Sequence, residues 1–309
     1  TFANSFHISE GASLGSYNVG VKFKQSDEYP FAYHSFRVAE YRKPEFQVTA
    51  FPSVTDVLAG DAYKLTLDAA YYSGGFVGGA DVNWFLSASS STFNPAPAFS
   101  NFSFSDFDYD RFDADPVPPT TLLKEDESKL DANGHLEIAE TSALGKYKNG
   151  SQVRFAANVT DVSGNLVSGG TSLHVHPSLI YAGIRSQSYV GLQGQPSVFD
   201  LVVLDWESNP IPNQKLTVDI IRREWYSVQE KDGQGTLRWV TTVKDIPVET
   251  GLEATTDKDG LASVSFDPPS GGVYKAIVHV EDEKGNKQQS SQFIWVAGKE
   301  YIPWQQTND

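Results

Sequence analysis

The chain has 309 residues and a formal charge of −15 at pH 7, which arises from 39 acidic and 24 basic residues. Such an excess of negative charge would repel a phosphate backbone and argues against nucleic acid as a partner, and the absence of cysteine excludes disulfides, thiolate nucleophiles and cysteine-ligated metals. The length allows about two domains of ordinary size, the 19 Phe, 14 Tyr and 6 Trp residues can fill several cores, and no run of about 18 apolar residues is present that could span a membrane.

Residues 1–41 contain two stretches with the alternation of half-buried strands. Apolar side chains occupy every second position from Tyr17 to Phe23, and again at Phe36 and Val38. A segment of about 40 residues cannot bury a two-sheet core by itself, so we expect it to be the C-terminal part of a preceding domain. Because the chain starts at Thr1 and contains no methionine, we also expect it to be an excised or processed piece of a longer protein.

A break in the strand pattern follows at residues 41–46. The alternation reaches Val38 on one side and resumes at Phe46 on the other, and Pro44 lies between them. Proline has no N–H for a strand ladder and holds the preceding Lys43 extended, so the chain can leave one sheet here and enter another. We interpret this stretch as a domain junction, with a bulged edge strand inside one domain as the alternative. The predicted junction residues are Tyr41, Arg42, Lys43, Pro44 and Phe46.

Residues 42–178 are predicted to form the first complete sandwich. Alternating strands separated by glycine turns run from Phe46 to Leu86, and they return from Leu130 to His176. Between them, over about residues 87–125, the pattern gives way to Ser, Phe, Pro and Asp. We expect a long insertion there, and long loops inside a compact domain are often functional.

Residues 179–298 repeat this plan, and residues 299–309 are predicted to link to a following domain. Two pairs of turn motifs align between the segments: Asp131-x-x-Gly134 with Asp257-x-x-Gly260, and Asp161-x-x-Gly164-Asn165 with Asp282-x-x-Gly285-Asn286. The chain therefore contains a domain-sized repeat, with one partial and two complete copies. Strands joined by frequent turns, without helical periodicity, predict an all-β chain of tandem antiparallel β-sandwiches of the immunoglobulin or fibronectin kind.

The stretch Phe36-Arg37-Val38-Ala39-Glu40-Tyr41-Arg42-Lys43-Pro44-Glu45-Phe46-Gln47-Val48 resembles the junction between consecutive macroglobulin-like domains in the α2-macroglobulin and complement family, in its bacterial form. Two further stretches agree with such domains. They are Gly60-Asp61 through Ala80, and Val203-Leu204-Asp205-Trp206 through Gly298. The resemblance covers essentially the whole chain, and it implies macroglobulin-like sandwiches.

The resemblance also implies a function. Members of this family are large protease traps that present a bait stretch, change shape when it is cut, and in many cases capture the protease through a thioester of Cys and Gln. This chain has no cysteine for a thioester, and no stretch is identified as bait. The resemblance therefore implies a non-catalytic scaffold with neighbouring domains of the same chain and, through the parent protein, proteases as partners. The implied location is extracytoplasmic, in the periplasm or at the cell surface, with any membrane anchor outside this chain.

His174 and His176 lie on one face of a predicted strand, a spacing that can serve a metal ion. A zinc site needs at least three protein ligands, and no third ligand is evident nearby. We therefore interpret both as surface or junction histidines. Pro177 ends the strand, and we expect Pro177 and Tyr181 to set a second domain junction.

The insertion carries five aspartates among aromatic residues: Asp106, Asp108, Asp110, Asp113 and Asp115. Clustered carboxylates suggest calcium, but the aromatics between them and the lack of a glycine for the sharp turn do not fit an EF-hand. We favour a solvated acidic loop whose aromatics pack back onto the same sandwich, with calcium as the alternative. The Asp-x-x-Gly motifs are interpreted as hairpin turns, because Asp bonds its own backbone and Gly takes positive φ.

No catalytic function is predicted. Histidines are few, no Gly-x-Ser-x-Gly stretch is present, and no converging set of catalytic groups is found; neither a metal nor a cofactor is expected. The alternative function is a surface adhesin or a carbohydrate-binding sandwich array, in which exposed aromatics would stack on sugars. The candidates for that role are Trp225, Trp239, Phe104 and Tyr109. In either case we expect the two complete domains to meet end to end through modest interfaces.

Overall fold

The computed structural model describes residues 15–22, 32–38, 44–107, 109–110, 113–114, 117–231 and 237–298, together with the single positions 5, 8 and 13. The chain divides into two units, residues 1–45 and 46–309. In the first unit, β1 (Gly15–Val21) and β2 (Ala32–Val38) form an antiparallel hairpin, and Tyr17 stacks on Phe36 with ring centroids 5.7 Å apart. The predicted junction residues Tyr41, Arg42 and Lys43 and the predicted linker 299–309 lie outside the described residues.

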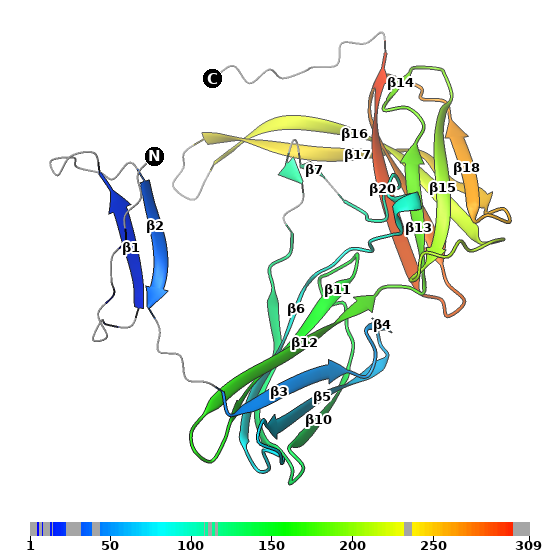
Figure 1. Ribbon diagram of the computed structural model, residues 1–309. Helices are drawn as coiled ribbons and strands as arrows, with labels where there is room; N and C mark the ends of the chain where they lie inside the picture. The colour runs from blue at the N-terminus through cyan, green and yellow to red at the C-terminus, as the bar shows by residue number, and fades with distance from the viewer. Residues whose placement is uncertain are drawn as a thin grey trace. The chain divides into compact units, whose positions relative to one another are not determined.

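The second unit begins with a sandwich of a three-stranded and a five-stranded sheet (Figure 1). The three-stranded sheet has the order β10 (His135–Thr141), β5 (Ala62–Tyr71), β3 (Phe46–Pro52). The five-stranded sheet has the order β4 (Asp56–Leu58), β12 (Leu166–His176), β11 (Ser151–Thr160), β6 (Asp81–Ser90), β9 (Thr121–Lys129). The short strand β4 pairs with β12 in parallel, and the other pairs are antiparallel.

A second sandwich follows with the same topology. Its three-stranded sheet has the order β13 (Ile180–Ser186), β15 (Ser197–Asp205), β18 (Leu261–Phe266). Its five-stranded sheet has the order β14 (Val190–Leu192), β20 (Lys287–Ala297), β19 (Gly272–Glu281), β16 (Lys215–Lys231), β17 (Leu237–Thr255). Each strand of the first sandwich has a counterpart in the second, so the repeat predicted from the turn motifs is present in the topology. The predicted fold class, tandem antiparallel β-sandwiches, is confirmed.

Each sandwich has its own core between its two sheets. In β6, every second side chain points inward, so Val82, Trp84 and Leu86 are buried while Asn83 and Phe85 between them are exposed. Phe199 and Leu201 of β15 and Tyr274 of β19 have the same role in the second core. Burying a side chain of this size contributes about 1.5–3 kcal/mol. The predicted junction residue Phe46 is wholly buried in the first core, while Pro44 is exposed.

The Asp-x-x-Gly motifs are tight turns. Asp161 and Asp282 turn between the paired strands β11–β12 and β19–β20, as expected for hairpins. The prediction of hairpins is wrong for Asp131 and Asp257, because each connects strands that belong to different sheets. In the turn between β9 and β10, Asp131 Oδ1 accepts hydrogen bonds from the backbone N–H groups of Asn133 at 2.8 Å and His135 at 2.9 Å. Gly134 has φ +70°, and a Cβ there would lie 2.4 Å from the Ala69 carbonyl oxygen, so the position requires glycine. The same arrangement of Asp with the N–H groups two and four residues on occurs at Asp161, Asp257 and Asp282.

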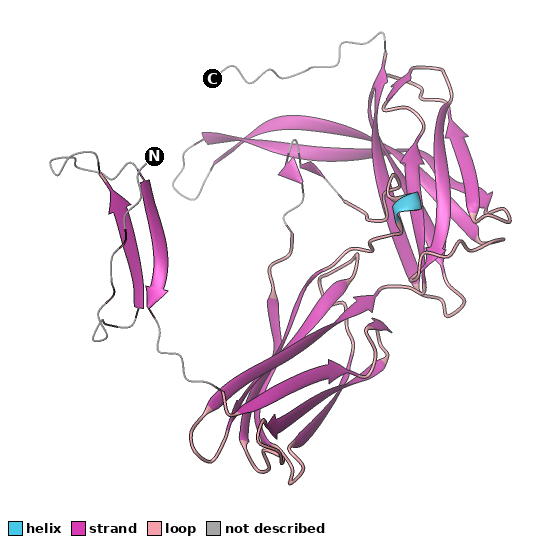
Figure 2. Ribbon diagram, viewed as in Figure 1, coloured by secondary structure: helices cyan, strands magenta, loops and turns pink. Residues whose placement is uncertain are grey.

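The connection from β6 to β9 in the first sandwich and the equivalent connection from β16 to β17 in the second are built differently. In the first, the chain leaves the sheet after β6 and forms a single turn of 3-10 helix, η1 (Pro97–Phe99), and a short hairpin of β7 (Tyr109–Asp110) and β8 (Asp113–Ala114), before β9. In the second, β16 and β17 pair with each other as a long two-stranded ribbon (Figure 2). Among the described residues, no helix has the length and apolar character needed to cross a lipid bilayer.

Candidate functional site

The two sandwiches are joined by a short linker whose backbone is held on both sides. β12 ends at His176 and β13 begins at Ile180, so residues 177–179 make the whole connection. Ser178 Oγ and the Leu179 N–H donate to Asp282 Oδ2 over 3.1 and 2.9 Å. Burial opposes ionisation of Asp282, but the hydrogen bond from Leu179 and those from its own turn hold the pKa of Asp282 below its usual value. A turn aspartate of the second sandwich therefore fixes the linker.

His176 connects elements of both sandwiches. Its Nε2 lies 2.8 Å from Asp56 Oδ1 on β4, and its Nδ1 lies 2.8 Å from the Tyr181 hydroxyl on β13. The imidazole also stacks on Trp206, which follows β15, with ring centroids 4.4 Å apart and an interplanar angle of 18°. Trp206 Nε1 in turn donates to the carbonyl of Ser178 over 2.8 Å. The interpretation of His176 as a junction histidine agrees with this position.

Burial favours the neutral form of this histidine, against the charge of Asp56. Burial lowers the pKa of His176, and the carboxylate of Asp56 offsets this only in part. Burial also opposes ionisation of Asp56, but the hydrogen bond to His176 keeps the pKa of Asp56 below its usual value. Burial raises the pKa of the Tyr181 hydroxyl, which therefore stays protonated and can donate to His176 Nδ1. A neutral imidazole, with one donor and one acceptor nitrogen, satisfies both neighbours.

A second connection is made by residues 91–107 of the first sandwich, called here the strap. Ser103 pairs with β13 like the end of an added strand, because its N–H donates to the Ile184 carbonyl over 2.8 Å and its carbonyl accepts from the Ile184 N–H over 3.0 Å. Two residues further along, the strap contacts β20, where the Ser291 N–H donates to the Ser105 carbonyl. The side chain of Gln288 donates to the Phe104 carbonyl. The strap thus adds backbone hydrogen bonds to the edge of the neighbouring sandwich.

Aromatic side chains of the strap form an apolar cluster on the outer face of the β13 and β15 strands. Phe104, only 4% exposed, packs with Tyr181, Val202 and Leu204, and Phe93 stacks on Tyr181 with ring centroids 4.3 Å apart. Gly183 makes room for this contact, because a Cβ at Gly183 would lie 2.6 Å from the Phe104 ring.

The prediction that the aromatics of the acidic loop pack back onto their own sandwich is wrong for Phe107, whose ring contacts Phe293 on β20 with centroids 6.0 Å apart. Phe93 and Phe104, earlier in the same insertion, also pack on the second sandwich. The reason is geometric. The outer face of β13 and β15 carries large apolar side chains at Tyr181, Val202 and Leu204 that need cover, while β6 leads the strap toward them. The sandwiches thus do not meet by their ends alone.

An ion pair holds the far end of the strap. Asp106 Oδ1 lies 2.8 Å from Lys275 Nζ on β19, and the two side chains are 14% and 3% exposed. Gln289 Nε2 donates to Asp106 Oδ2 over 2.6 Å, and the side chain of Asn149 bonds to the backbone of Asp106 in both directions, at 3.2 and 3.1 Å. Burial opposes ionisation of Asp106, but Lys275 and these bonds hold the pKa of Asp106 below its usual value.

Asp106 is therefore a structural ion-pair partner, not a member of a solvated acidic loop. Asp108 and Asp115 lie outside the described residues, as do the side chains of Asp110 and Asp113. Within the parts of the chain that the structure describes, no group of three or more His, Asp or Glu side chains is placed to hold a metal ion.

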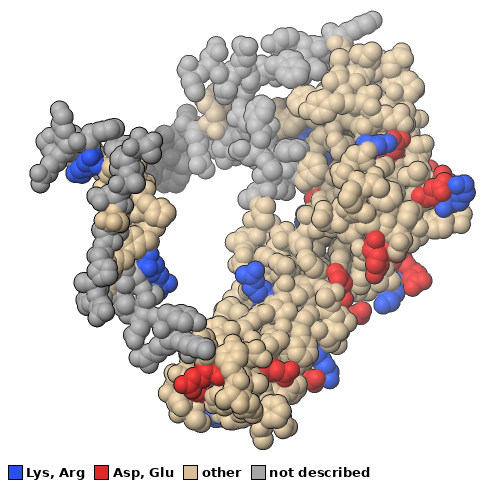
Figure 3. Space-filling model, viewed as in Figure 1, with Lys and Arg blue, Asp and Glu red and all other residues tan. Residues whose placement is uncertain are grey.

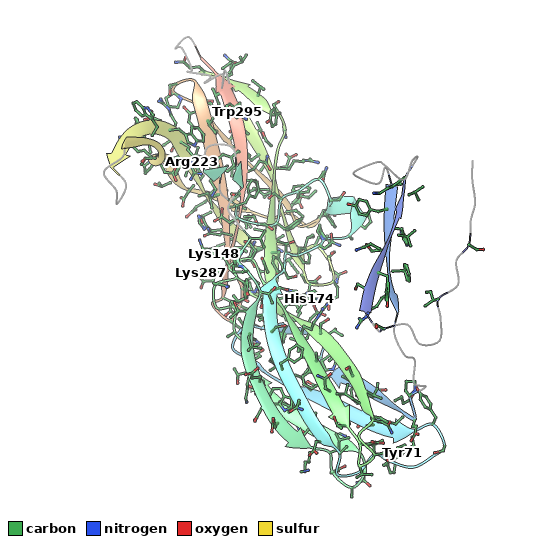
Figure 4. The ribbon with its side chains drawn as sticks, turned by 90° about the vertical axis from the view of Figure 1, so that its left-hand side faces the viewer. Tyr71, Lys148, His174, Arg223, Lys287 and Trp295 are labelled. Carbon is green, nitrogen blue, oxygen red and sulfur yellow. The ribbon has the colours of Figure 1, made fainter. Side chains whose placement is uncertain are left out.

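The linker 177–179, His176 and the strap hold the two sandwiches together, and this region is called here the joint. Two hollows flank it. A cleft of about 880 Å³ lies between the loop containing Lys148 and Asn149 and the strands β16, β19 and β20, and a smaller one of about 180 Å³ lies beside Ser91, His174 and Trp206. The larger cleft mixes Lys148, Lys215 and Lys287 with Asp106, Asp219 and Glu281, so charges of both signs line it. Figure 4 shows Lys148, Lys287 and His174 at the level of the joint, and Figure 3 shows acidic and basic side chains interspersed on one face of the two sandwiches.

The residues predicted for the second junction lie in this joint. Pro177 is buried in the linker and Tyr181 is 1% exposed between His176 and Phe93. Sequence reasoning missed the partners that hold them, which are Asp56, Phe93, Trp206 and Asp282. The sequence did contain a signal for this contact, the density of phenylalanine in an otherwise polar insertion. Clustered apolar side chains are seldom left exposed, so such a segment is expected to pack against another surface.

Among the described side chains proposed for sugar binding, Phe104 lies apart from Trp225 and Trp239. Phe104 is buried in the joint, so its assignment as an exposed sugar platform is wrong. Trp239 is 68% exposed on the ribbon, and Trp225 on the opposite strand is half-buried. The side chain of Tyr109 lies outside the described residues.

The comparisons with known proteins agree with this architecture. Residues 183–298 match the family model described as bacterial macroglobulin domain 6. An α2-macroglobulin homolog of Nostoc sp. is 24% identical over 306 residues, which is 98% of this chain and 15% of that protein. The resemblance to macroglobulin domains of bacterial α2-macroglobulins is thus confirmed.

Solved structures show the same fold. The native conformation of Escherichia coli α2-macroglobulin aligns with a TM-score of 0.62 and 18% identity, over 97% of this chain and 18% of that one. Salmonella α2-macroglobulin reacted with methylamine aligns with a TM-score of 0.60 and 17% identity, over 93% of this chain and 18% of that one. The chain therefore spans less than a fifth of the length of these relatives.

Proposed function

Because the chain carries macroglobulin domains like those of the bacterial α2-macroglobulins, we propose that it is a non-catalytic scaffold of an α2-macroglobulin-like protease inhibitor. In this proposal the parent protein is extracytoplasmic, proteases are its partners, and the bait and any thioester lie outside residues 1–309. The contribution of these residues is mechanical. They hold two sandwiches at one angle so that the domains on either side are placed correctly.

The observation that carries this proposal is the strap. A chain segment of one sandwich is inserted into the surface of the next, with Phe104 buried and Asp106 paired to Lys275. Tandem domains in one chain usually move relative to one another unless their interface is large and apolar. Here a three-residue linker, an aromatic cluster and a buried ion pair all oppose such motion. The first junction, Tyr41 to Phe46, is proposed to set the angle to the preceding unit in the same manner as Pro177 and Tyr181 set the second.

The test uses the full-length parent protein and a protease such as trypsin. A trapped protease keeps its activity toward a small chromogenic peptide but loses activity toward a large protein substrate, because the trap excludes the large substrate. We expect the wild-type parent to show this difference and the Phe104→Ala variant to show less of it. The matched control is Trp239→Ala, an exposed aromatic away from the joint. A parent protein that leaves both activities unchanged would overturn the proposal.

The second candidate, a carbohydrate-binding array, is favoured by one observation, the exposed Trp239 together with Tyr226, which is 42% exposed on the facing strand. Exposed aromatics can stack on sugar faces. Binding of the purified chain to a glycan array, lost in Trp239→Ala, would support this function, and a wild-type chain that binds no glycan would exclude it.

A further inference from the structure

The joint contains a buried histidine that the scaffold function does not require. His176 is 9% exposed, and both of its ring nitrogens are engaged, one with Asp56 of the first sandwich and one with Tyr181 of the second. Its flat face is covered by Trp206, another residue of the second sandwich. The imidazole is thus placed so that its protonation state affects contacts on both sides of the linker.

We propose that His176 is a pH-sensitive lock, which holds the two sandwiches together when it is neutral and releases their contact when it is protonated. The proposal goes beyond the scaffold function, because it concerns the coupling of the two sandwiches whatever the parent protein binds.

The hydrogen bonds show why the neutral form is the locked one. In the neutral imidazole, the Nε2–H donates to Asp56 and Nδ1 accepts the hydroxyl proton of Tyr181. A proton added at Nδ1 makes both nitrogens donors, so the Tyr181 hydroxyl has to turn its own proton elsewhere. Tyr181 is 1% exposed and packed against Phe93, and among the described residues its hydroxyl has one hydrogen-bond partner, His176 Nδ1. A buried hydroxyl without an acceptor is costly, and moving β13 away from β12 relieves it.

The groups that face His176 act in both directions. Asp56 on β4, Glu207 after β15 and the ring of Trp206 favour the protonated form. Burial opposes it most strongly, and His174, with ring centroids 6.4 Å apart on the same strand, opposes it as well. Burial prevails, so the pKa of His176 lies below its usual 6.5.

The sign of the pH effect follows from linkage. When the joint opens, His176 regains a pKa near 6.5, so the open state binds more protons than the closed one below that pH. The lock is therefore at full strength above pH 6.5, and it weakens as the pH falls through and below that value toward the lowered pKa of the closed state. One proton changes the open-to-closed ratio by at most about tenfold per pH unit. The carboxyls of the joint do not interfere in this window, because the pKa values of Asp56, Asp106 and Asp282 are all held below 3.8.

The natural absence of cysteine makes a direct test simple. Val162→Cys, 89% exposed in the first sandwich, and Tyr189→Cys, 72% exposed in the second, allow two spin labels to be attached to the full chain without other changes. Electron–electron double resonance then measures the distance distribution between the sandwiches. We expect one narrow distribution at pH 7.5 and a broader one at pH 5.0.

Two variants separate the lock from general acid sensitivity. In His176→Gln, the amide can donate to Asp56 and accept from Tyr181 but cannot titrate, so the distribution should stay narrow at both pH values. The control His135→Gln changes a histidine that bonds to Asp68 within the first sandwich and does not face His176, and it should keep the wild-type response. A wild-type distribution that does not change with pH, or a His176→Gln response equal to wild type, would overturn the proposal.

A second measurement covers the case in which His176→Gln disturbs the joint at neutral pH. Nuclear magnetic resonance of the imidazole carbon in the wild-type chain gives the pKa of His176 directly. A midpoint below 6.5, accompanied by shifts at Trp206, supports the lock, and a midpoint at or above 6.5 contradicts it. None of these readouts involves a protease, so their failure leaves the scaffold proposal standing, and the failure of protease trapping leaves the lock standing.

Discussion

The connection from β6 to β9 in the first sandwich differs from its counterpart, β16 to β17, in the second. After β6 the chain leaves the sheet and becomes the strap that enters the neighbouring sandwich, whereas after the equivalent part of β16 it continues as a two-stranded ribbon with β17. The β19 strand supports β16 only as far as Arg223, and the ribbon extends beyond that point.

The difference begins in the local sequence. β6 ends in Ser87-Ala88-Ser89-Ser90, and Pro95 and Pro97 follow shortly after. Proline cannot donate to a ladder, so the strand cannot continue through these positions. β16 continues instead through Trp225, Tyr226 and Val228, residue types that favour strands. A domain repeat can therefore keep one core plan while a single connection decides whether neighbouring domains are coupled.

The largest expected effect comes from the apolar contact of the strap. Phe104→Ala removes a ring that is 4% exposed and leaves a cavity against Tyr181 and Gly183. Removing a buried Phe costs about 3–5 kcal/mol. We expect the strap to detach and a single calorimetric unfolding transition of residues 46–298 to separate into two. One unchanged transition in this variant would show that the linker alone couples the sandwiches.

The next effect comes from the ion pair at the end of the strap. Asp106→Asn keeps the shape but removes the charge facing Lys275, and a buried hydrogen bond to a charged group contributes about 1.5–3 kcal/mol. Because the pKa of Asp106 is lowered, its contribution is present above 3.8 and is lost as the pH falls below that value. Urea unfolding at pH 7 and pH 3 should therefore differ less in Asp106→Asn than in wild type. The control is Asp81→Asn, whose partner Lys129 is also exposed and whose removal should leave the profile unchanged.

A smaller effect is expected at the linker. Trp206→Phe keeps an aromatic face for His176 but removes the Nε1–H that donates to the Ser178 carbonyl. The loss of one such bond costs about 0.5–1.5 kcal/mol. Faster hydrogen exchange at Leu179 and Ile180 than in wild type, with unchanged exchange in β19, would locate the effect in the linker. Equal acceleration in both places would mean that the tryptophan supports the whole second sandwich.

The smallest effect is expected on the ribbon. Trp239→Ala changes a side chain that is 68% exposed, and substitutions at exposed sites usually change stability by less than about 0.5 kcal/mol. A loss as large as that of Phe104→Ala would mean that the ribbon is packed against something other than solvent, and the contrast between ribbon and strap would then fail. Thermal unfolding of both variants under one condition makes the comparison.

Features coded by neighbouring residues were predictable from the sequence. The alternation in β6 predicts which of its side chains face the core, and the Asp-x-x-Gly motifs predict tight turns, because an aspartate that bonds the N–H groups two and four residues on needs nothing distant. The break at Pro177 marks the end of a strand for the same reason. These strand and turn patterns recur in the same order in residues 42–178 and 179–298, which predicts tandem sandwiches. Together with the junction sequence, they indicate the resemblance to macroglobulin domains.

The contacts of the joint were decided by tertiary structure alone. His176 meets Asp56 across 120 positions of sequence, Ser178 meets Asp282 across 104, and Phe104 is bonded by Gln288 across 184. No local pattern specifies such partners, because the first depends on how β4 pairs with β12 and the other two depend on how the second sandwich places its surface beside the linker and the strap. For that reason the sequence by itself identifies a proline-containing junction, and only the folded chain shows that a strap, an ion pair and a buried histidine hold it.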